Sequence, residues 1–209
     1  MKPRASKTSA PRAGNVTPIT ELHLAIHASA GRTHLPFLRK HLRAAHQLLS
    51  TPLAELSLAL VGDARMSSLH KKFMNIDGPT DVLTFPLEFD CDGRETAGEI
   101  VICVPEAARQ GRRRGTTVAC ELLLYALHGM LHLSGFDDRT EAGFRQMHRK
   151  EDDILTHLGI GPIFETEGSA GRRNPHVSSA RIANRSSGQR TRTGETIRRR
   201  NRAFKSVGV

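Results

Sequence analysis

The chain has 209 residues, of which 38% are hydrophobic, and its formal net charge is +10. Domains commonly run ~100–200 residues, so this length suits one compact domain with tails, and the apolar content excludes a wholly disordered protein. No apolar run approaches the ~18 residues that a bilayer-spanning helix needs, which excludes an integral membrane protein.

Residues 1–18 form a basic leader, and residues 1–19 contain four basic side chains and no acidic one. The leader lacks the apolar core of a secretory signal, and we expect it to be disordered. A cytoplasmic location follows, with an organelle transit peptide as the alternative. The three cysteines, Cys91, Cys103 and Cys120, form no C-x-x-C pair and are interpreted as reduced thiols.

The first half of the domain alternates predicted strands and helices. Apolar residues at period two predict a strand over 19–27, and leucines at helical spacing predict an amphipathic helix over 34–49. A second strand covers 55–61, and a short helix over 63–73 follows it. Asp63 is the expected N-cap of that helix, because its carboxylate can accept a hydrogen bond from an unpaired backbone N–H.

The second half begins with a loop over 74–81 and a strand over 82–89. After a polar turn, the continuous apolar run 99–104 predicts a strand that is buried on both faces. Three helices complete the domain, and they span Pro105 to about Arg114, 118–133 and 140–158. The helix over 118–133 is almost wholly apolar and should be central, and Gly135 should end it.

This order of elements predicts an α+β fold in which a small mixed β-sheet of about four strands carries its helices mainly on one side. The domain should span residues 19–165, which include most of the acidic side chains. Residues 168–209 contain eleven basic residues and one acidic residue. We expect this Arg-rich tail to be disordered, because it has too few apolar residues to offset the entropy of ordering. It is interpreted either as an RNA- or ribosome-binding tail or as a solvated extension.

The segment HGMLHLSGFDD carries the strongest chemical signal. His128 and His132 lie one helical turn apart, so their imidazoles point the same way and can share a metal ion. Gly135 permits a sharp turn after the helix, which lets Asp138 return to the same ion. Asp137 is the alternative, either as the ligand or as a residue that orients a histidine. Zinc suits histidine-rich ligation with one open position.

Extended zinc-protease motifs have the same spacing but place a glutamate, the general base, directly after the first histidine. This chain has Gly129 at that position, and glycine cannot transfer a proton. The hypothesis that this chain is a metallopeptidase is therefore disfavoured.

Four stretches of the chain resemble the YbeY family of endoribonucleases. HGMLHLSGFDD resembles the family's H-G-x-L-H-L-x-G-[YF]-D-H motif, and IDGPTDVLTFPLEF is similar to its D-x-P-T-[DN]-V-L-S-F-P loop and strand. AGEIVICVPEAARQ is similar to the family's G-D-I-x-I-x strand, and MHRKEDDIL to its M-x-x-x-E-x-x-I-L helix. The resemblance covers about residues 20–165 in the right order and excludes both tails.

The resemblance implies a metal-dependent, single-strand-specific endoribonuclease of ribosomal RNA maturation and ribosome quality control. The implied partners are single-stranded ribosomal RNA and the small ribosomal subunit, with no membrane and no small-molecule cofactor, and a monomer is favoured. His128, His132 and Asp138 would hold one zinc ion per chain. Thr80 and Asp81 are the candidate catalytic residues, because they would line the site beside the metal; ordinary turn chemistry is the alternative.

Two departures from the family pattern bear on turnover. Asp138 stands where the family has a third histidine, and its negative charge would leave a metal-bound water less acidic. Met74 stands where the family has an arginine implicated in catalysis, and methionine cannot hydrogen-bond a phosphate. The alternative function is therefore a catalytically weakened or inactive ribosome-assembly factor that keeps the fold.

His148 lies on the last predicted helix and is predicted to be a surface residue rather than a ligand. Six further histidines show no ligand spacing and are left unassigned: His23, His27, His41, His46, His70 and His157.

Overall fold

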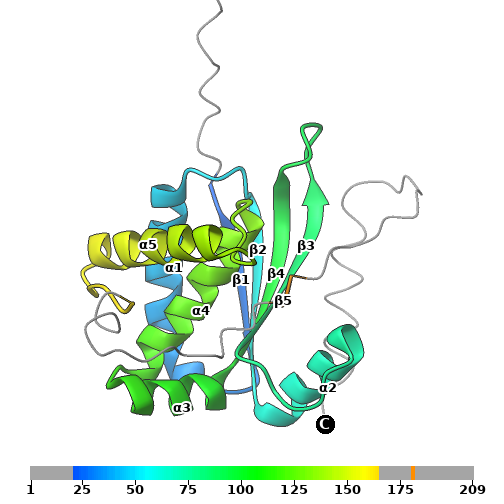
Figure 1. The fold of residues 1–209 in the computed structure, drawn as a ribbon, viewed down its shortest axis with the longest axis vertical. Coiled ribbons are helices and arrows are strands. Elements are labelled where there is room, and N and C mark those ends of the chain that lie inside the picture. The colour runs from blue at the N-terminus through cyan, green and yellow to red at the C-terminus, as the bar shows by residue number, and fades with distance from the viewer. Residues whose placement is uncertain (1–20, 165–179, 182–209) are drawn as a thin grey trace, which may run out of the picture.

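The computed structural model describes residues 21–164 and 180–181 (Figure 1). The strands are β1 (His23–Ala28), β2 (Glu55–Val61), β3 (Val82–Phe89), β4 (Glu95–Cys103) and the two-residue β5 (Ala180–Arg181). The helices are the 3-10 turn η1 (Arg32–His34), α1 (Leu35–Leu49), α2 (Asp63–Met74), α3 (Val104–Arg114), α4 (Val118–Leu133) and α5 (Glu141–His157).

The strands form one mixed sheet in the order β1-β2-β4-β3-β5. The first three in this order are parallel, β3 runs antiparallel to β4, and β5 pairs with β3 over two residues. The predicted α+β fold with a mixed sheet of about four strands is confirmed, and β5 is a short addition at the edge of β3.

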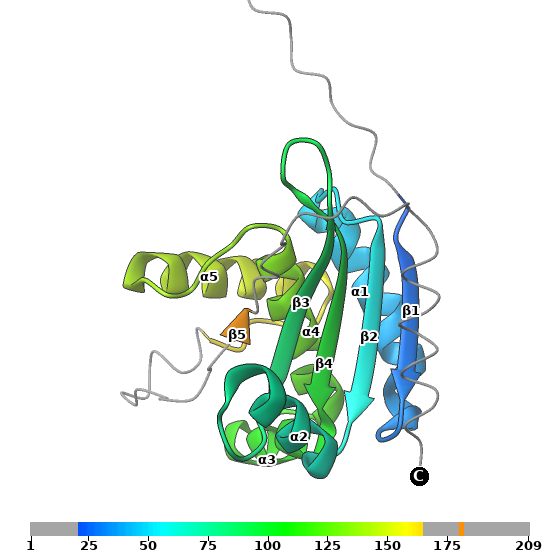
Figure 2. The ribbon, with the colours of Figure 1, turned by 90° about the vertical axis from the view of Figure 1, so that its right-hand side faces the viewer.

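The helices cover the two faces of the sheet unequally. Helices α1, α4 and α5 lie on one face, whereas α2 lies on the other (Figure 2). The larger apolar cluster fills the space between the sheet, α1, α4 and α5, and a smaller one lies under α2. The prediction that helices pack mainly on one side is confirmed.

Helix α4 is the central element of the core, as its composition predicts. Every residue from Glu121 to Leu133 is buried. The helix approaches the sheet closely at Gly129, where an added Cβ would lie 2.7 Å from Ile100 Cδ1 and 2.8 Å from Thr84 Oγ1. Gly135 follows the helix with φ +90° and donates its N–H to the His132 carbonyl at 3.0 Å, which confirms its predicted role.

Strand β4 differs from its predicted range, 99–104. It begins at Glu95, because Glu95 pairs with Phe89 of β3, and Asp90 closes the intervening turn by accepting the Arg94 N–H at 2.8 Å. It ends at Cys103, since α3 begins one residue later. The apolar run of residues 99–104 could not reveal this extension, because it depends on pairing with β3 and not on the hydrophobic pattern of β4 itself. The predicted burial of β4 on both faces is confirmed.

The predicted N-cap role of Asp63 is wrong. Gly62 occupies the cap position of α2, and Asp63 is the first helical residue. Its carboxylate instead accepts two hydrogen bonds from the Arg109 guanidinium, at 2.9 and 2.7 Å. A partner 46 residues away competes successfully with the local backbone, and it lowers the pKa of Asp63.

The predictions for the leader and for the Arg-rich tail lie outside the described residues, apart from Ala180 and Arg181 of β5. Within residues 21–164 and 180–181, no single helix is long and apolar enough to cross a membrane. Helices α3 and α4 reach that length and hydropathy only together, and they meet at a bend of 113°.

Candidate metal centre

Helix α4 brings two imidazoles together near its carboxyl end. His132 follows His128 by four positions, and both side chains are buried. Their Nε2 atoms lie 3.2 Å apart, with the ring planes nearly perpendicular at 87°. The helical spacing therefore juxtaposes the two nitrogens as the sequence predicted.

The turn after α4 adds a carboxylate to this pair. Asp138 Oδ2 lies 3.8 Å from His128 Nε2, and Asp138 Oδ1 lies 3.8 Å from His132 Nε2. The chain reverses at Gly135, and the Phe136 N–H donates to the Leu131 carbonyl at 3.0 Å, which folds the turn back on the helix. Three side chains thus converge on one point from a helix and the turn after it.

The outer nitrogens of both histidines are already engaged. His128 Nδ1 lies 2.7 Å from Glu151 Oε1, and His132 Nδ1 lies 3.1 Å from the Phe136 carbonyl oxygen. Both acceptors require a proton on Nδ1, so in the neutral imidazoles each Nε2 presents a lone pair. Two nitrogen lone pairs and a carboxylate that face one another are stabilised by a cation bound between them.

The spacing of these atoms fits a metal ion. Bonds of ~2.1 Å in a tetrahedral arrangement place ligand atoms about 3.4 Å apart, between the observed 3.2 and 3.8 Å. Among the described residues, His128, His132 and Asp138 are the group of three ligating side chains whose donor atoms all lie within 4.8 Å. The donor set therefore suits one divalent ion with an open coordination position.

The structure distinguishes the two adjacent aspartates. Asp137 is exposed, and its carboxylate accepts two hydrogen bonds from Arg139 Nε at 2.9 and 2.8 Å. The Arg139 guanidinium lowers the pKa of Asp137 to about 2. Asp138, rather than Asp137, faces the histidines.

Thr80 and Asp81 are both buried, directly before β3. Thr80 Oγ1 donates to Asp81 Oδ1 at 2.9 Å, and the Val82 N–H donates to the same oxygen at 2.8 Å. Burial raises the pKa of the Asp81 carboxyl, although His128 and these hydrogen bonds act in the opposite direction. Asp81 and His128 act on each other's pKa, so the Asp81 carboxyl lies near enough to His128 to interact electrostatically.

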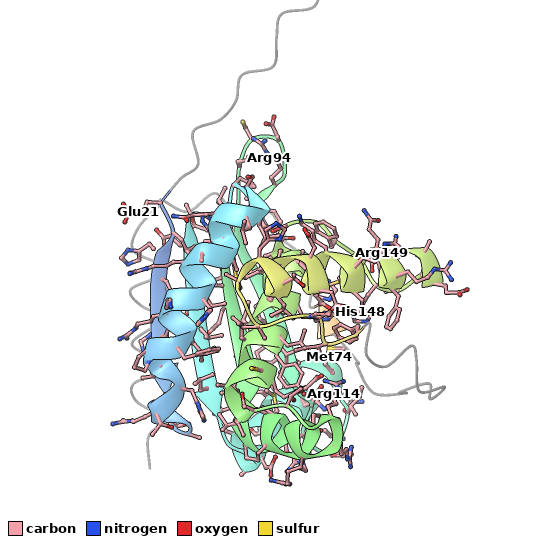
Figure 3. The ribbon with its side chains drawn as sticks, turned by 90° about the vertical axis from the view of Figure 1, so that its left-hand side faces the viewer. Glu21, Met74, Arg94, Arg114, His148 and Arg149 are labelled. Atoms are coloured by element: carbon pink, nitrogen blue, oxygen red, sulfur yellow. The ribbon has the colours of Figure 1, made fainter. Side chains whose placement is uncertain are left out.

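Sequence reasoning overlooked Glu151 and misplaced His148. Glu151 is fully buried on α5, and its second oxygen, Oε2, lies 2.6 Å from His148 Nδ1. His148 is buried rather than on the surface: Figure 3 shows it on the side of α5 that faces the molecule, whereas Arg149 points away. The helical spacing of His148 and Glu151 is a local signal, but only packing of α5 against α4 reveals their partner.

The electrostatics of the two candidate ligand histidines differ. Burial lowers the pKa of His128, but the Glu151 and Asp138 carboxylates outweigh it, so this pKa lies above its ordinary value. Burial and the neighbouring His128 lower the pKa of His132. Of the two imidazoles, His128 therefore holds a proton more readily in the metal-free protein.

Gly129 and Met74 lie on opposite faces of the sheet. Gly129 packs against Ile100 and Thr84 on the α4 face, where the close approach leaves no room for a glutamate side chain. Met74 is the last residue of α2, and its half-buried side chain packs against the smaller apolar cluster on the other face. Neither position supplies a proton-transfer group or a cation to the metal centre.

Comparisons with known proteins cover the segment that carries these side chains. A family model described as "Endoribonuclease YbeY" matches residues 28–159. An Endoribonuclease YbeY from Anaeromyxobacter sp. (strain Fw109-5) is 34% identical over 168 residues, which cover 80% of this chain and 88% of the relative. One from Moorella thermoacetica is 40% identical over 116 residues, covering 51% of this chain and 74% of the relative.

Among solved structures, the solution structure of a Thermotoga maritima protein covers 73% of this chain and 99% of its own, with 24% identity and a TM-score of 0.47. The family assignment rests on the sequence matches, and the family model spans most of the described residues, including all three residues of the candidate metal centre. The chain belongs to the YbeY endoribonuclease family.

Proposed function

We propose that this protein is a metal-dependent endoribonuclease that cleaves single-stranded ribosomal RNA during ribosome maturation. The observation that carries the proposal is the convergence of two histidine nitrogens and one carboxylate on a common point, in a chain of the YbeY family. The protein would act on RNA of the small ribosomal subunit, in the cytoplasm.

We assign one zinc ion per chain to His128, His132 and Asp138. The imidazole-rich donor set favours zinc over magnesium or calcium, which prefer oxygen ligands. When bound, such an ion lowers the pKa of a water ligand and polarises a phosphodiester. The protein's own part is to hold the two Nε2 atoms and the carboxylate in place, through the Nδ1 contacts to Glu151 and to the Phe136 carbonyl.

Thr80 and Asp81 are assigned to the wall of the site. Asp81 is held by the Thr80 hydroxyl and the Val82 N–H, so its carboxylate has a fixed orientation before substrate arrives. Burial raises the pKa of Asp81 above its ordinary value. A contact to the RNA from either residue is part of the proposal.

A catalytically weakened assembly factor is the second candidate, and Met74 is the observation that favours it. The family's arginine position holds an apolar side chain here, and it packs into an apolar cluster. Arg114 does not replace the missing guanidinium, because its Nη1 donates to the buried Glu121 carboxylate at 2.9 Å. In this alternative, the protein binds single-stranded RNA and metal but cleaves slowly.

Three substrates separate the alternatives: a labelled single-stranded fragment of ribosomal RNA, the same fragment annealed to its complement, and casein. We expect the zinc-loaded protein to cleave only the first, and the metal-stripped protein to cleave none until zinc is restored. His132→Ala should abolish cleavage and stoichiometric zinc, whereas the matched variant His157→Ala, at an exposed histidine of α5, should retain both. Zinc-independent cleavage, or hydrolysis of casein, contradicts the proposal; RNA binding without cleavage supports the assembly factor.

A further inference from the structure

Glu151 is a fully buried carboxylate held between two imidazoles from different parts of the chain. Its Oε1 lies 2.7 Å from Nδ1 of His128 on α4, and its Oε2 lies 2.6 Å from Nδ1 of His148 on α5. Each carboxylate oxygen thus faces one ring nitrogen, so the carboxylate accepts one hydrogen bond from each histidine.

These contacts determine which nitrogen of His128 is available to a metal. Because both Glu151 oxygens accept from a ring nitrogen, both Nδ1 atoms carry the hydrogen, and the Nε2 of His128 is left with its lone pair facing His132 and Asp138. A carboxylate behind a ligating histidine also raises the basicity of the ligand and fixes the rotation of the ring.

His148 holds the second oxygen of that carboxylate, and its own ring is held on two sides. The Phe144 ring meets it edge-on at a centroid distance of 4.0 Å, and the Phe164 ring stacks on it at 3.8 Å. Phe164 is fixed in turn, because its N–H donates to Asp152 Oδ1 at 3.1 Å, which folds the segment after α5 back on the helix. The Nδ1–H of His148 thus has a defined direction.

We propose that Glu151 and His148 are a positioning pair for the metal ligand His128, with His148 fixing the carboxylate that orients the His128 ring. The inference rests on the proposed metal centre and adds to it two residues that touch neither the ion nor RNA. If His148 lost its donor, Oε2 of Glu151 would be a buried anionic oxygen without this hydrogen bond. The carboxylate would then rotate or draw in water, and His128 would lose its fixed orientation.

The test measures metal binding by the full-length protein. His148→Phe keeps an aromatic ring between Phe144 and Phe164 but removes the donor, and His148→Asn restores an N–H donor in a smaller side chain. Glu151→Gln removes the charge and one of the two acceptors. His157→Phe is the matched control, because His157 is an exposed histidine at the end of the same helix. Zinc affinity is measured by competition with a chromophoric chelator, and the ligand geometry by the visible absorption spectrum of the cobalt-loaded protein.

We expect His148→Phe and Glu151→Gln to lower zinc affinity by about 10- to 100-fold and to alter the cobalt spectrum, the usual effect of losing such an outer partner. His148→Asn should recover most of the affinity, and His157→Phe should match the wild type. Circular dichroism of the metal-free proteins identifies any variant that fails to fold. If His148→Phe fails to fold, the zinc affinity and cobalt spectrum of Glu151→Gln and His148→Asn test the proposal instead.

Two negative results have different meanings. If the wild type itself binds no zinc and no cobalt, the proposed metal centre is refuted, and the positioning pair with it. If the wild type binds both, but every folded variant shows the same affinity and cobalt spectrum, the positioning role alone is refuted, and Glu151 and His148 serve only the packing of α5 on α4.

Discussion

Gly143 links the packing of α5 to the geometry of the metal centre. It is the third residue of α5, where its N–H donates to the capping Thr140 hydroxyl at 3.1 Å. A Cβ at this position would overlap the carbonyl oxygen of Asp137, next to the proposed ligand Asp138. Because the obstructing atom is backbone, no side-chain rotation relieves the overlap, and the loop before α5 must move.

The size of that movement sets the expected effect of Gly143→Ala. The Asp137 carbonyl must retreat by about 1 Å to reach the shortest distance that real Cβ contacts show. Metal–ligand distances tolerate only about ±0.2 Å, so a shift of this size at the neighbouring residue should displace Asp138 from the ion. We expect zinc affinity to fall about tenfold or more. Overpacking should also cost the metal-free protein about 1–3 kcal/mol, partly offset by up to ~1 kcal/mol of helix propensity.

The assay pairs zinc competition with urea unfolding of the metal-free protein, on Gly143→Ala and on the control Gly62→Ala. The control suits the comparison because nothing lies within 4 Å of an added Cβ at Gly62, and its φ of −87° is accessible to alanine. Unchanged zinc affinity in Gly143→Ala would show that the loop absorbs the displacement without moving Asp138, and the reasoning would be refuted.

Four further predictions follow from the centre and from the tail. Asp138→Ala should bind zinc far more weakly than the wild type, whereas Asp138→His should keep the ion and move the pH–rate profile of RNA cleavage toward lower pH, because a neutral ligand leaves bound water more acidic. Zinc affinity, measured by titration at several pH values, should decrease as the pH falls from above about 6.5, because protons compete with zinc for Nε2 of His128. The Glu151 and Asp138 carboxylates raise the pKa of His128, so Glu151→Gln should move this loss of affinity to lower pH. Met74→Arg tests the weakened-factor alternative: faster RNA cleavage at unchanged zinc content would support it, whereas we expect an unchanged rate, because position 74 lies on the sheet face opposite the proposed metal centre. Removing residues 168–209 should leave the melting temperature nearly unchanged and flatten the salt dependence of RNA binding, because eleven basic side chains are lost.

Local pattern was sufficient for most of the fold and for the three proposed metal ligands. Local sequence patterns located the five α-helices and the four long strands within residues 21–164, although not the 3-10 turn η1 or the full length of β4, because each pattern reflects the geometry of a single element. His128 and His132 are juxtaposed by one turn of one helix, and Gly135 with its positive φ brings Asp138 back within six residues of the second histidine. These features depend only on residues close together in the chain.

The supporting contacts depend on tertiary structure, since their partners are far apart in sequence. Glu151 meets His128 across 23 residues, and Arg109 takes Asp63 away from its expected cap across 46. Asp137 and Asp138 are identical in type and adjacent, and only the position of Arg139 relative to the folded turn separates them. The sequence predicts His148 to be a surface residue, but the segment after α5 folds back and stacks Phe164 on its ring. Long-range packing therefore decides which of the polar residues are held rigidly beside the metal centre, because burial and hydrogen-bond partners are properties of the assembled fold.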